Sequence, residues 1–198
     1  MKIVGIDDPD VVNKCIKVLQ SGGVVMHPTE TCYGLAVDIS NEEALKKLYR
    51  IKGRDSVKPV SILVDSLGMG EELGIFSEKA LELAHMYWPG PLSIVVPRKR
   101  VLPEALNPGQ DFVSIRHSSH DFSTKMVEEF GGAITTTSAN LAGMPALYTC
   151  EVDELGDLGE EIDLVVDGGV ILQNQPSTVV KVDGDFIEVL RQGEILCE

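Results

Sequence analysis

The sequence predicts an α/β protein in which helices cover a sheet of both parallel and antiparallel strands. Segments with helical spacing of apolar residues alternate with short, continuous apolar runs, as in sheets flanked by helices. Near the C-terminus, the apolar runs 177–182 and 186–190 flank Asp183-Gly184, which is a strong signal for an antiparallel hairpin. The hairpin makes the sheet mixed. No repeat or linker divides the 198 residues, so we expect a single domain spanning 1–198.

Four helices are predicted from apolar stripes that lie between end signals. The first opens on Asp8-Pro9, with proline at the first helical position. The second opens on a capping box of Ser40 and Glu43 and stops at Gly53. The third and fourth helices are expected at 77–88 and 122–130. The remaining apolar runs predict strands at 24–26, 60–64, 92–96, 112–116, 133–136 and 164–166.

The charge of the chain argues against indiscriminate binding to nucleic acid. The formal net charge is −14, whereas such binding depends on lysine and arginine neutralising phosphates. Half of this excess lies in 151–163, a run rich in carboxylates that contains no basic residue and is expected to form a solvated helix-and-loop face. The hydrophobic content of 43% and the charged content of 24% are ordinary for a globular domain.

Composition and spacing also predict the compartment. No apolar run approaches the roughly 20 residues that a membrane helix needs, and the N-terminal apolar stretch is too short for a secretory signal. The four cysteines are scattered singly, which predicts free thiols and neither a zinc site nor a disulfide framework. We therefore expect a cytoplasmic protein without a membrane partner.

Polar and charged residues cluster where three of the predicted elements end. Thr29-Glu30-Thr31 follows the strand 24–26, Lys52-Gly53-Arg54 follows the second helix with Lys58 close behind, and 135–140 combines four hydroxyls with an amide. Open α/β sheets bind ligands at such strand ends. Each cluster also has a purely structural interpretation, because a helix C-terminus stabilises cations and hydroxyl groups cap turns.

The familiar catalytic fingerprints do not occur in the sequence. There is no phosphate-binding P-loop, no dinucleotide-binding glycine pattern and no spacing typical of a nucleophilic triad. The histidines are dispersed, and we interpret them as structural or surface residues: His27, His85, His117 and His120. The residues alone therefore indicate a polar, locally cationic pocket for an anionic ligand.

The motifs, taken in order, resemble those of the YrdC/Sua5 family. They are PTETCYGL, KGR followed by KPVSILV, WPGPLSIVV, SIRH, TTTSANLAGMP, PSTVV and LRQG. Each motif is weak alone, but seven in register between about residue 10 and Gly193 form a specific pattern.

The resemblance implies a fold and an activity. The family fold is a twisted mixed α/β sheet with flanking helices that encloses a large cleft. Its established members are threonylcarbamoyl-AMP synthases, nucleotidyltransferases that join L-threonine, bicarbonate or CO2, and ATP and release pyrophosphate. Mg²⁺ is expected on the ATP phosphates, with no metal site of the protein's own. A separate transfer enzyme then passes the threonylcarbamoyl group to adenosine 37 of tRNA.

The resemblance also assigns residues by position. It implies that the ATP phosphates are held by Lys52, Arg54, Ser138 and Asn140, of which Lys52 and Arg54 are expected to be catalytic. It implies that Thr136 and Arg191 line the nucleotide, and that L-threonine contacts Thr29, Arg116 and Ser177. Replacing Lys52 or Arg54 by alanine is expected to reduce turnover while leaving the fold intact.

Other positions near the motifs receive weaker assignments. Glu30 is expected to orient neighbouring donors or to bind a cation, and Gly34 to let the backbone turn away close to the ligand. The sequence departs from the family pattern at Cys32, a position that is often valine, and at Leu63, where some members carry a histidine near threonine. The chain ends before the second C-terminal domain of the longer members, and we expect that domain to be absent.

Two other functions compete with the synthase. The first is a double-stranded RNA or tRNA-binding module without adenylating activity, which would use a basic cleft built from Lys52, Arg54, Lys58 and 98–100. The second is a carbamoyl-transfer domain of the hydrogenase-maturation type. Proteins of that type add zinc-finger cysteines and an acylphosphatase segment, and this sequence has neither.

Overall fold

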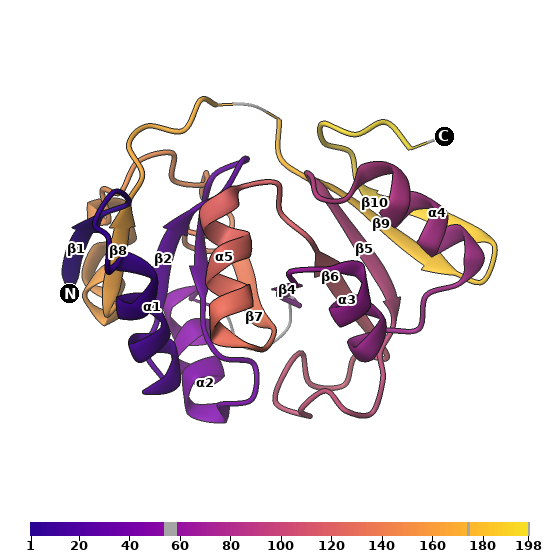
Figure 1. The fold of residues 1–198 in the computed structure, drawn as a ribbon, viewed down its shortest axis with the longest axis horizontal. Coiled ribbons are helices and arrows are strands. Elements are labelled where there is room, and N and C mark those ends of the chain that lie inside the picture. Colours follow the sequence, from indigo (N-terminus) through magenta and orange to yellow (C-terminus); the bar gives the residue numbers. More distant parts are fainter. Residues whose placement is uncertain (54–58, 174, 198) are drawn as a thin grey trace.

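The computed structural model describes residues 1–53, 59–173 and 175–197, and within them it forms one ten-stranded sheet with helices on both faces (Figure 1). The helices are α1 (Val11–Gln20), α2 (Glu42–Ile51), α3 (Leu67–Leu73), α4 (Glu78–Tyr87) and α5 (Asp121–Phe130), with a 3₁₀ segment, η1 (Asp153–Glu161). The strands are β1 (Lys2–Gly5), β2 (Val25–Pro28), β3 (Tyr33–Ala36), β4 (Ser61–Leu63), β5 (Leu92–Pro97), β6 (Phe112–Arg116), β7 (Ile134–Ser138), β8 (Leu164–Asp167), β9 (Thr178–Asp183) and β10 (Phe186–Arg191).

The sheet is mixed, as the sequence predicted. The strand order is β1-β8-β2-β3-β7-β4-β6-β5-β9-β10. β4 runs parallel to β6 and β5 parallel to β9, whereas β7 is antiparallel to both of its neighbours. β9 and β10 form the antiparallel hairpin expected at Asp183-Gly184. Figure 1 shows the strands splaying apart between β7 and β5, with the two termini at opposite ends of the molecule.

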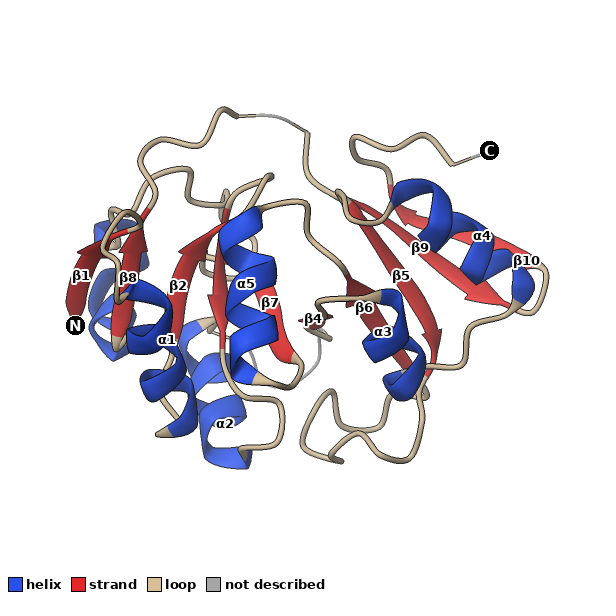
Figure 2. Ribbon diagram, in the orientation of Figure 1, coloured by secondary structure: helices blue, strands red, loops and turns tan. Residues whose placement is uncertain are grey.

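The two faces of the sheet carry separate apolar cores. One face is covered by α1 and α5, whose buried side chains pack against strand residues that include Val25, Leu63 and Ile134. The opposite face carries a larger core to which α2, α4 and η1 contribute, against residues such as Ile62 and Ile115 (Figure 2). Because side chains alternate between the faces of a strand, consecutive residues such as Ile62 and Leu63 enter different cores.

The starts of the first two helices differ from the prediction. α1 begins at Val11, and Asp8 lies before the helix, where its carboxylate accepts a hydrogen bond from the Asp10 amide at 2.8 Å. α2 is capped by Asn41, whose side-chain oxygen accepts from the Ala44 amide at 3.0 Å. Asp8 and Asp10 are both residues that cap helices well, and so are Ser40 and Asn41. The local sequence therefore allows each helix to begin at either residue of its pair. The C-terminal stop of α2 is confirmed by Gly53, which adopts a left-handed φ of 59°.

Three elements carry no clear pattern in the sequence. β1 lies at a sheet edge and pairs only with β8, and β3 is four residues long with a glycine inside it. α3 is a short helix capped by Ser66 and interrupted by glycines. Such elements form because tertiary pairing supplies the stability that local propensity does not. The third predicted helix also ends one residue early, at Tyr87.

No helix in the described ranges is long and apolar enough to span a bilayer. The four cysteines are free thiols, as expected, and Cys15 is fully buried in the core under α1. The acidic run forms η1 and its flanks, and several of its residues are exposed, which agrees with the predicted solvated face.

Candidate active site

The sheet face that carries α1 and α5 continues into an uncovered, polar region. Thr136 and Ser138 share a strand face with Ile134, and Ser61 shares one with Leu63, because side chains alternate along a strand. Ile134 and Leu63 lie in the apolar core under these helices, whereas the hydroxyl residues line a cavity of about 760 Å³. A change from apolar to hydroxyl side chains along one face therefore marks where the core ends and the site begins.

The floor of the cavity continues across the sheet as a row of small polar residues. Ser93 on β5, Ser114 on β6 and Ser61 on β4 all line it, and the Ser61 and Ser114 hydroxyls lie 2.7 Å apart. Sequence reasoning missed these serines. The sequence does contain a signal for them. Each of three mainly apolar strands contains one serine on the face where a core residue is expected.

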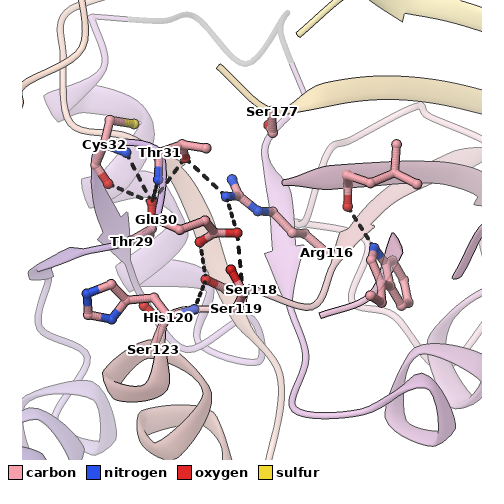
Figure 3. A network of polar contacts seen from close by, with 12 residues as sticks. Thr29, Glu30, Thr31, Cys32, Arg116, Ser118, Ser119, His120, Ser123 and Ser177 are labelled. Atoms are coloured by element: carbon pink, nitrogen blue, oxygen red, sulfur yellow. Dashed lines mark hydrogen bonds and ion pairs between the residues drawn. The ribbon is translucent and has the colours of Figure 1, made fainter. Parts of the chain in front are cut away.

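A tight turn from Thr29 to Cys32 forms one wall. The Thr29 hydroxyl accepts hydrogen bonds from the Thr31 and Cys32 amides, each at 3.2 Å, and donates to the Cys32 carbonyl at 2.7 Å. This hydroxyl therefore organises the turn. The lone pairs and the proton of the Thr29 hydroxyl are used within the turn. The Thr31 hydroxyl instead accepts a hydrogen bond from Arg116 (Figure 3).

Arg116 and Glu30 form a buried ion pair beside this turn. The Arg116 Nη2 lies 2.9 Å from Glu30 Oε1 and donates to the Thr31 hydroxyl at 3.1 Å. Ser118 donates to the other Glu30 oxygen (Figure 3). Burial alone would raise the pKa of Glu30, but the Arg116 charge and the hydrogen bonds from Arg116 and Ser118 hold this pKa below its usual value. Arg116 Nε makes no hydrogen bond within the described residues.

A second polar group joins α2 to the end of β7. Lys52 is fully buried, and its ammonium donates to the Ser138 carbonyl and to the Asn140 side-chain oxygen. The Ser138 hydroxyl donates to the same Asn140 oxygen at 2.7 Å. Ser138 and Asn140 line the cavity, and Lys52 lies behind them. The lysine charge thus supports two neutral groups that face the cavity.

The opposite wall comes from the C-terminal hairpin. Arg191 on β10 donates to the Ser177 carbonyl at 3.0 Å and to its hydroxyl at 2.8 Å, and both residues line the cavity. Burial lowers the pKa of Arg191, and the like charge of Arg116 lowers it further. Two guanidinium groups therefore face one cavity in a protein of net charge −14, an arrangement suited to an anion.

The predicted site residues mostly meet at this one cavity. Its lining includes Thr29, Arg116, Thr136, Ser138, Asn140, Ser177 and Arg191. Lys52 contacts two of them from behind, whereas Arg54 and Lys58 lie outside the described residues. The individual roles that the resemblance gave these residues stay predictions.

The geometry changes the expectation for Gly34 and places Leu63 and Cys32, the two positions that depart from the family pattern. Gly34 was expected at a turn, but it lies within β3, pairs with His27 and is not among the residues with positive φ, so the position does not use the backbone freedom of glycine. Leu63 is fully buried in the core under α1 and α5 and is not a cavity residue. Cys32 does line the cavity, and burial raises the pKa of its thiol.

The basic cleft considered for RNA is not assembled by the described residues. Arg98 donates to backbone carbonyls of the loop 102–110, including Leu106 at 2.9 Å and Pro103 at 2.8 Å. Lys99 donates to the Glu71 carbonyl at 2.6 Å. Neither lines the cavity. Among the described residues there is also no group of three or more His, Cys, Asp or Glu side chains that could hold a metal ion.

Comparison with known proteins identifies the family. The family model Sua5/YciO/YrdC, described as "Telomere recombination", matches residues 17–193. The chain belongs to the Sua5/YciO/YrdC family. This confirms the resemblance carried by the motifs.

Members of the Sua5/YciO/YrdC family with names or structures extend the comparison. The chain is 36% identical over 197 residues to a threonylcarbamoyl-AMP synthase of Bacillus subtilis, covering 97% of this chain and 56% of the relative. It is 34% identical to a threonylcarbamoyl-AMP synthase of Mus musculus, covering 93% and 67%. The crystal structure of Pyrococcus abyssi Sua5 complexed with L-threonine superposes with a TM-score of 0.87 at 30% identity, covering 97% and 57%. The chain thus spans about half the length of the first and third of these relatives.

Proposed function

We propose that this chain is a threonylcarbamoyl-AMP synthase, a nucleotidyltransferase that acts on L-threonine, bicarbonate or CO2, and ATP. The observation that carries the proposal is the meeting of Arg116, Arg191 and the Ser138–Asn140 pair around one cavity. The names of the relatives support the same activity. The product is proposed to serve tRNA modification through a separate transfer enzyme.

The reaction explains why such residues are needed. The amine of threonine adds to CO2 and loses a proton, giving a carbamate, whose oxygen then forms a bond to the α-phosphorus of ATP. The bond from that phosphorus to the bridging oxygen breaks, and pyrophosphate leaves. Nucleophile and phosphate are both anionic, so the site has to neutralise and align them.

We assign the two ends of the cavity to the two substrates. The carboxylate of threonine is proposed to bind Arg116, because this guanidinium lines the cavity and guanidinium groups form charge-assisted hydrogen bonds with carboxylates. The triphosphate is proposed to lie against Ser138 and Asn140, with the Lys52 charge behind them. Arg191 and Ser177 close the site from the hairpin. Mg²⁺ bound to the phosphates would neutralise part of their charge.

The test is to follow pyrophosphate release with ATP, Mg²⁺, bicarbonate and L-threonine. We expect release that depends on L-threonine and on bicarbonate. Release at the same rate without threonine would contradict the proposal. A filter-binding titration with double-stranded RNA at two salt concentrations provides the second arm, since tight, salt-dependent binding without ATP turnover would favour the RNA-binding alternative.

A further inference from the structure

The carboxylate of Glu30 accepts hydrogen bonds from three groups that lie along the chain between β6 and α5. Arg116 Nη2 is 2.9 Å from Oε1, and the Ser119 amide donates to the same oxygen at 3.3 Å. The Ser118 hydroxyl donates to Oε2 (Figure 3). Arg116 lines the cavity, whereas Glu30 and Ser118 lie behind its wall. An effect of either residue on a ligand in the cavity therefore has to pass through Arg116.

Ser118 connects this carboxylate to the start of α5. The residue is 1% exposed. Its hydroxyl accepts a hydrogen bond from the His120 amide at 3.2 Å, and its carbonyl accepts one from the Thr124 hydroxyl at 3.0 Å. His120 immediately precedes α5, and this helix packs into an apolar core through its buried side chains. The core thus sets the position of the Ser118 hydroxyl, and through it the position of the Glu30 carboxylate.

The guanidinium of Arg116 depends on this carboxylate for its direction. All its hydrogen bonds to described residues come from Nη2, which contacts Glu30 and the Thr31 hydroxyl, and its Nε makes none. An arginine side chain carries about 2 kcal/mol of rotamer entropy. A ligand has to overcome this entropy on binding unless the protein has already fixed the group.

A carboxylate at this position has a cost for the binding of an anion. The charge of Glu30 repels a second carboxylate that approaches the same guanidinium, whereas a neutral acceptor would not. A charged acceptor, however, makes a shorter and stronger hydrogen bond than a neutral one. The presence of Glu30 is therefore explained if a fixed direction of the Arg116 guanidinium matters more than its full charge.

We propose that Glu30 and Ser118 are positioning residues, which together fix the Arg116 guanidinium at the cavity wall so that its remaining donors are held ready for the carboxylate of the amino-acid substrate. This rests on the role of Arg116 in the proposed function. Glu30 supplies the charge-assisted hydrogen bond. Ser118 keeps the Glu30 carboxylate from turning, because its own hydroxyl is tied to the start of α5.

The first experiment is Ser118→Ala, which removes one hydroxyl and leaves both charges of the ion pair in place. We expect S118A to raise the KM for L-threonine about tenfold, the loss expected for one hydrogen bond to a charged group, and to leave the KM for ATP unchanged. The matched control is Ser123→Ala on α5. Ser123 is 0% exposed and donates to the Pro28 carbonyl at 2.9 Å, away from the ion pair. A threonine KM in S118A equal to that of S123A or of wild type would overturn the proposal.

The second experiment observes the guanidinium directly and does not depend on turnover. Protein labelled with ¹⁵N in arginine is examined by NMR without substrates, and the Arg116 signals are identified by their absence from Arg116→Lys. A guanidinium that is held in place rotates slowly about its Cζ–Nε bond, so its two terminal nitrogens give separate resonances. A freely rotating guanidinium gives one averaged resonance.

We expect separate Arg116 resonances in wild type and in S123A, and an averaged resonance in S118A. An averaged resonance in wild type overturns the proposal even where S118A does not fold, and separate resonances in S118A overturn it as well. This outcome is independent of pyrophosphate release. A failure of the positioning role is therefore distinguished from a failure of the proposed function.

Discussion

The Glu30–Arg116 ion pair provides a quantitative test of how the site is built. The Arg116 side chain is 8% exposed and that of Glu30 is 17% exposed, so the pair is largely removed from water. Glu30→Gln removes the negative charge but keeps the shape of the side chain and one acceptor oxygen. The variant therefore leaves the Arg116 charge buried with only neutral partners.

The expected magnitude follows from the geometry. With an Nη2–Oε1 contact of 2.9 Å the charge centres lie about 4 Å apart, where opposite charges attract by about 4 kcal/mol at an effective dielectric constant of ~20. Removing one partner of a buried pair costs about 3–5 kcal/mol in other proteins. Because glutamine retains a neutral hydrogen bond, we expect a smaller loss, about 2–3 kcal/mol in the free energy of unfolding at pH 7.

The pH dependence has a definite sign. The folded-state pKa of Glu30 lies below its ordinary value of 4.5, which means that ionisation stabilises the folded protein. This contribution is fully present above pH 4.5 and is lost as the pH falls through the folded-state pKa. The difference in stability between wild type and E30Q should therefore be largest at neutral pH and should shrink below pH 4.5.

Urea unfolding at several pH values measures both effects. The matched control is Glu82→Gln, which removes a carboxylate that is also 2.9 Å from its partner, Lys79. That pair is exposed, so E82Q should have little measurable effect. The reasoning fails if E30Q is as stable as wild type at pH 7, or if its deficit is the same at acid pH.

Two further predictions concern the cations of the site. Arg116→Lys should raise the KM for L-threonine at least about tenfold, because a rigid, planar guanidinium can bond Glu30 and Thr31 and still offer donors to a carboxylate, which a flexible ammonium does not reproduce. An unchanged KM in the pyrophosphate assay would remove Arg116 from the threonine subsite. Lys52→Met should lower both turnover and the free energy of unfolding, the latter by about 2 kcal/mol, because Lys52 is buried, the Ser138 carbonyl would lose this donor, and the Asn140 oxygen would keep only its bond from the Ser138 hydroxyl. The expectation from sequence that replacing Lys52 leaves the fold intact stays a prediction, and urea unfolding of the variant tests whether the fold is kept at reduced stability. Unaltered stability would contradict the loss of about 2 kcal/mol expected here.

The fold was largely predictable because its signals are local. The hairpin at Asp183-Gly184 and the stripes of α1, α2, α4 and α5 depend on turn chemistry and on helical periodicity, which neighbouring residues determine. The starts of α1 and α2 were wrong by two residues and one residue, because neighbouring residues such as Ser40 and Asn41 are both good caps and only the folded chain selects one. β1, β3 and α3 were not predicted, because their stability comes from contacts with residues far away in the sequence.

The sequence by itself determined the kind of protein: a mixed α/β sheet, clusters of hydroxyl and cationic residues at strand ends, and motifs that name a family. Tertiary structure alone decided how those clusters act. It placed Lys52 behind Ser138 and Asn140, and it paired Arg116 with Glu30. It also buried His27 opposite Gly34 in the pairing of β2 with β3. The physical reason is that burial, the distance between charges and the loss of water arise only when strands distant in sequence become neighbours, and these quantities set what each polar group can bind.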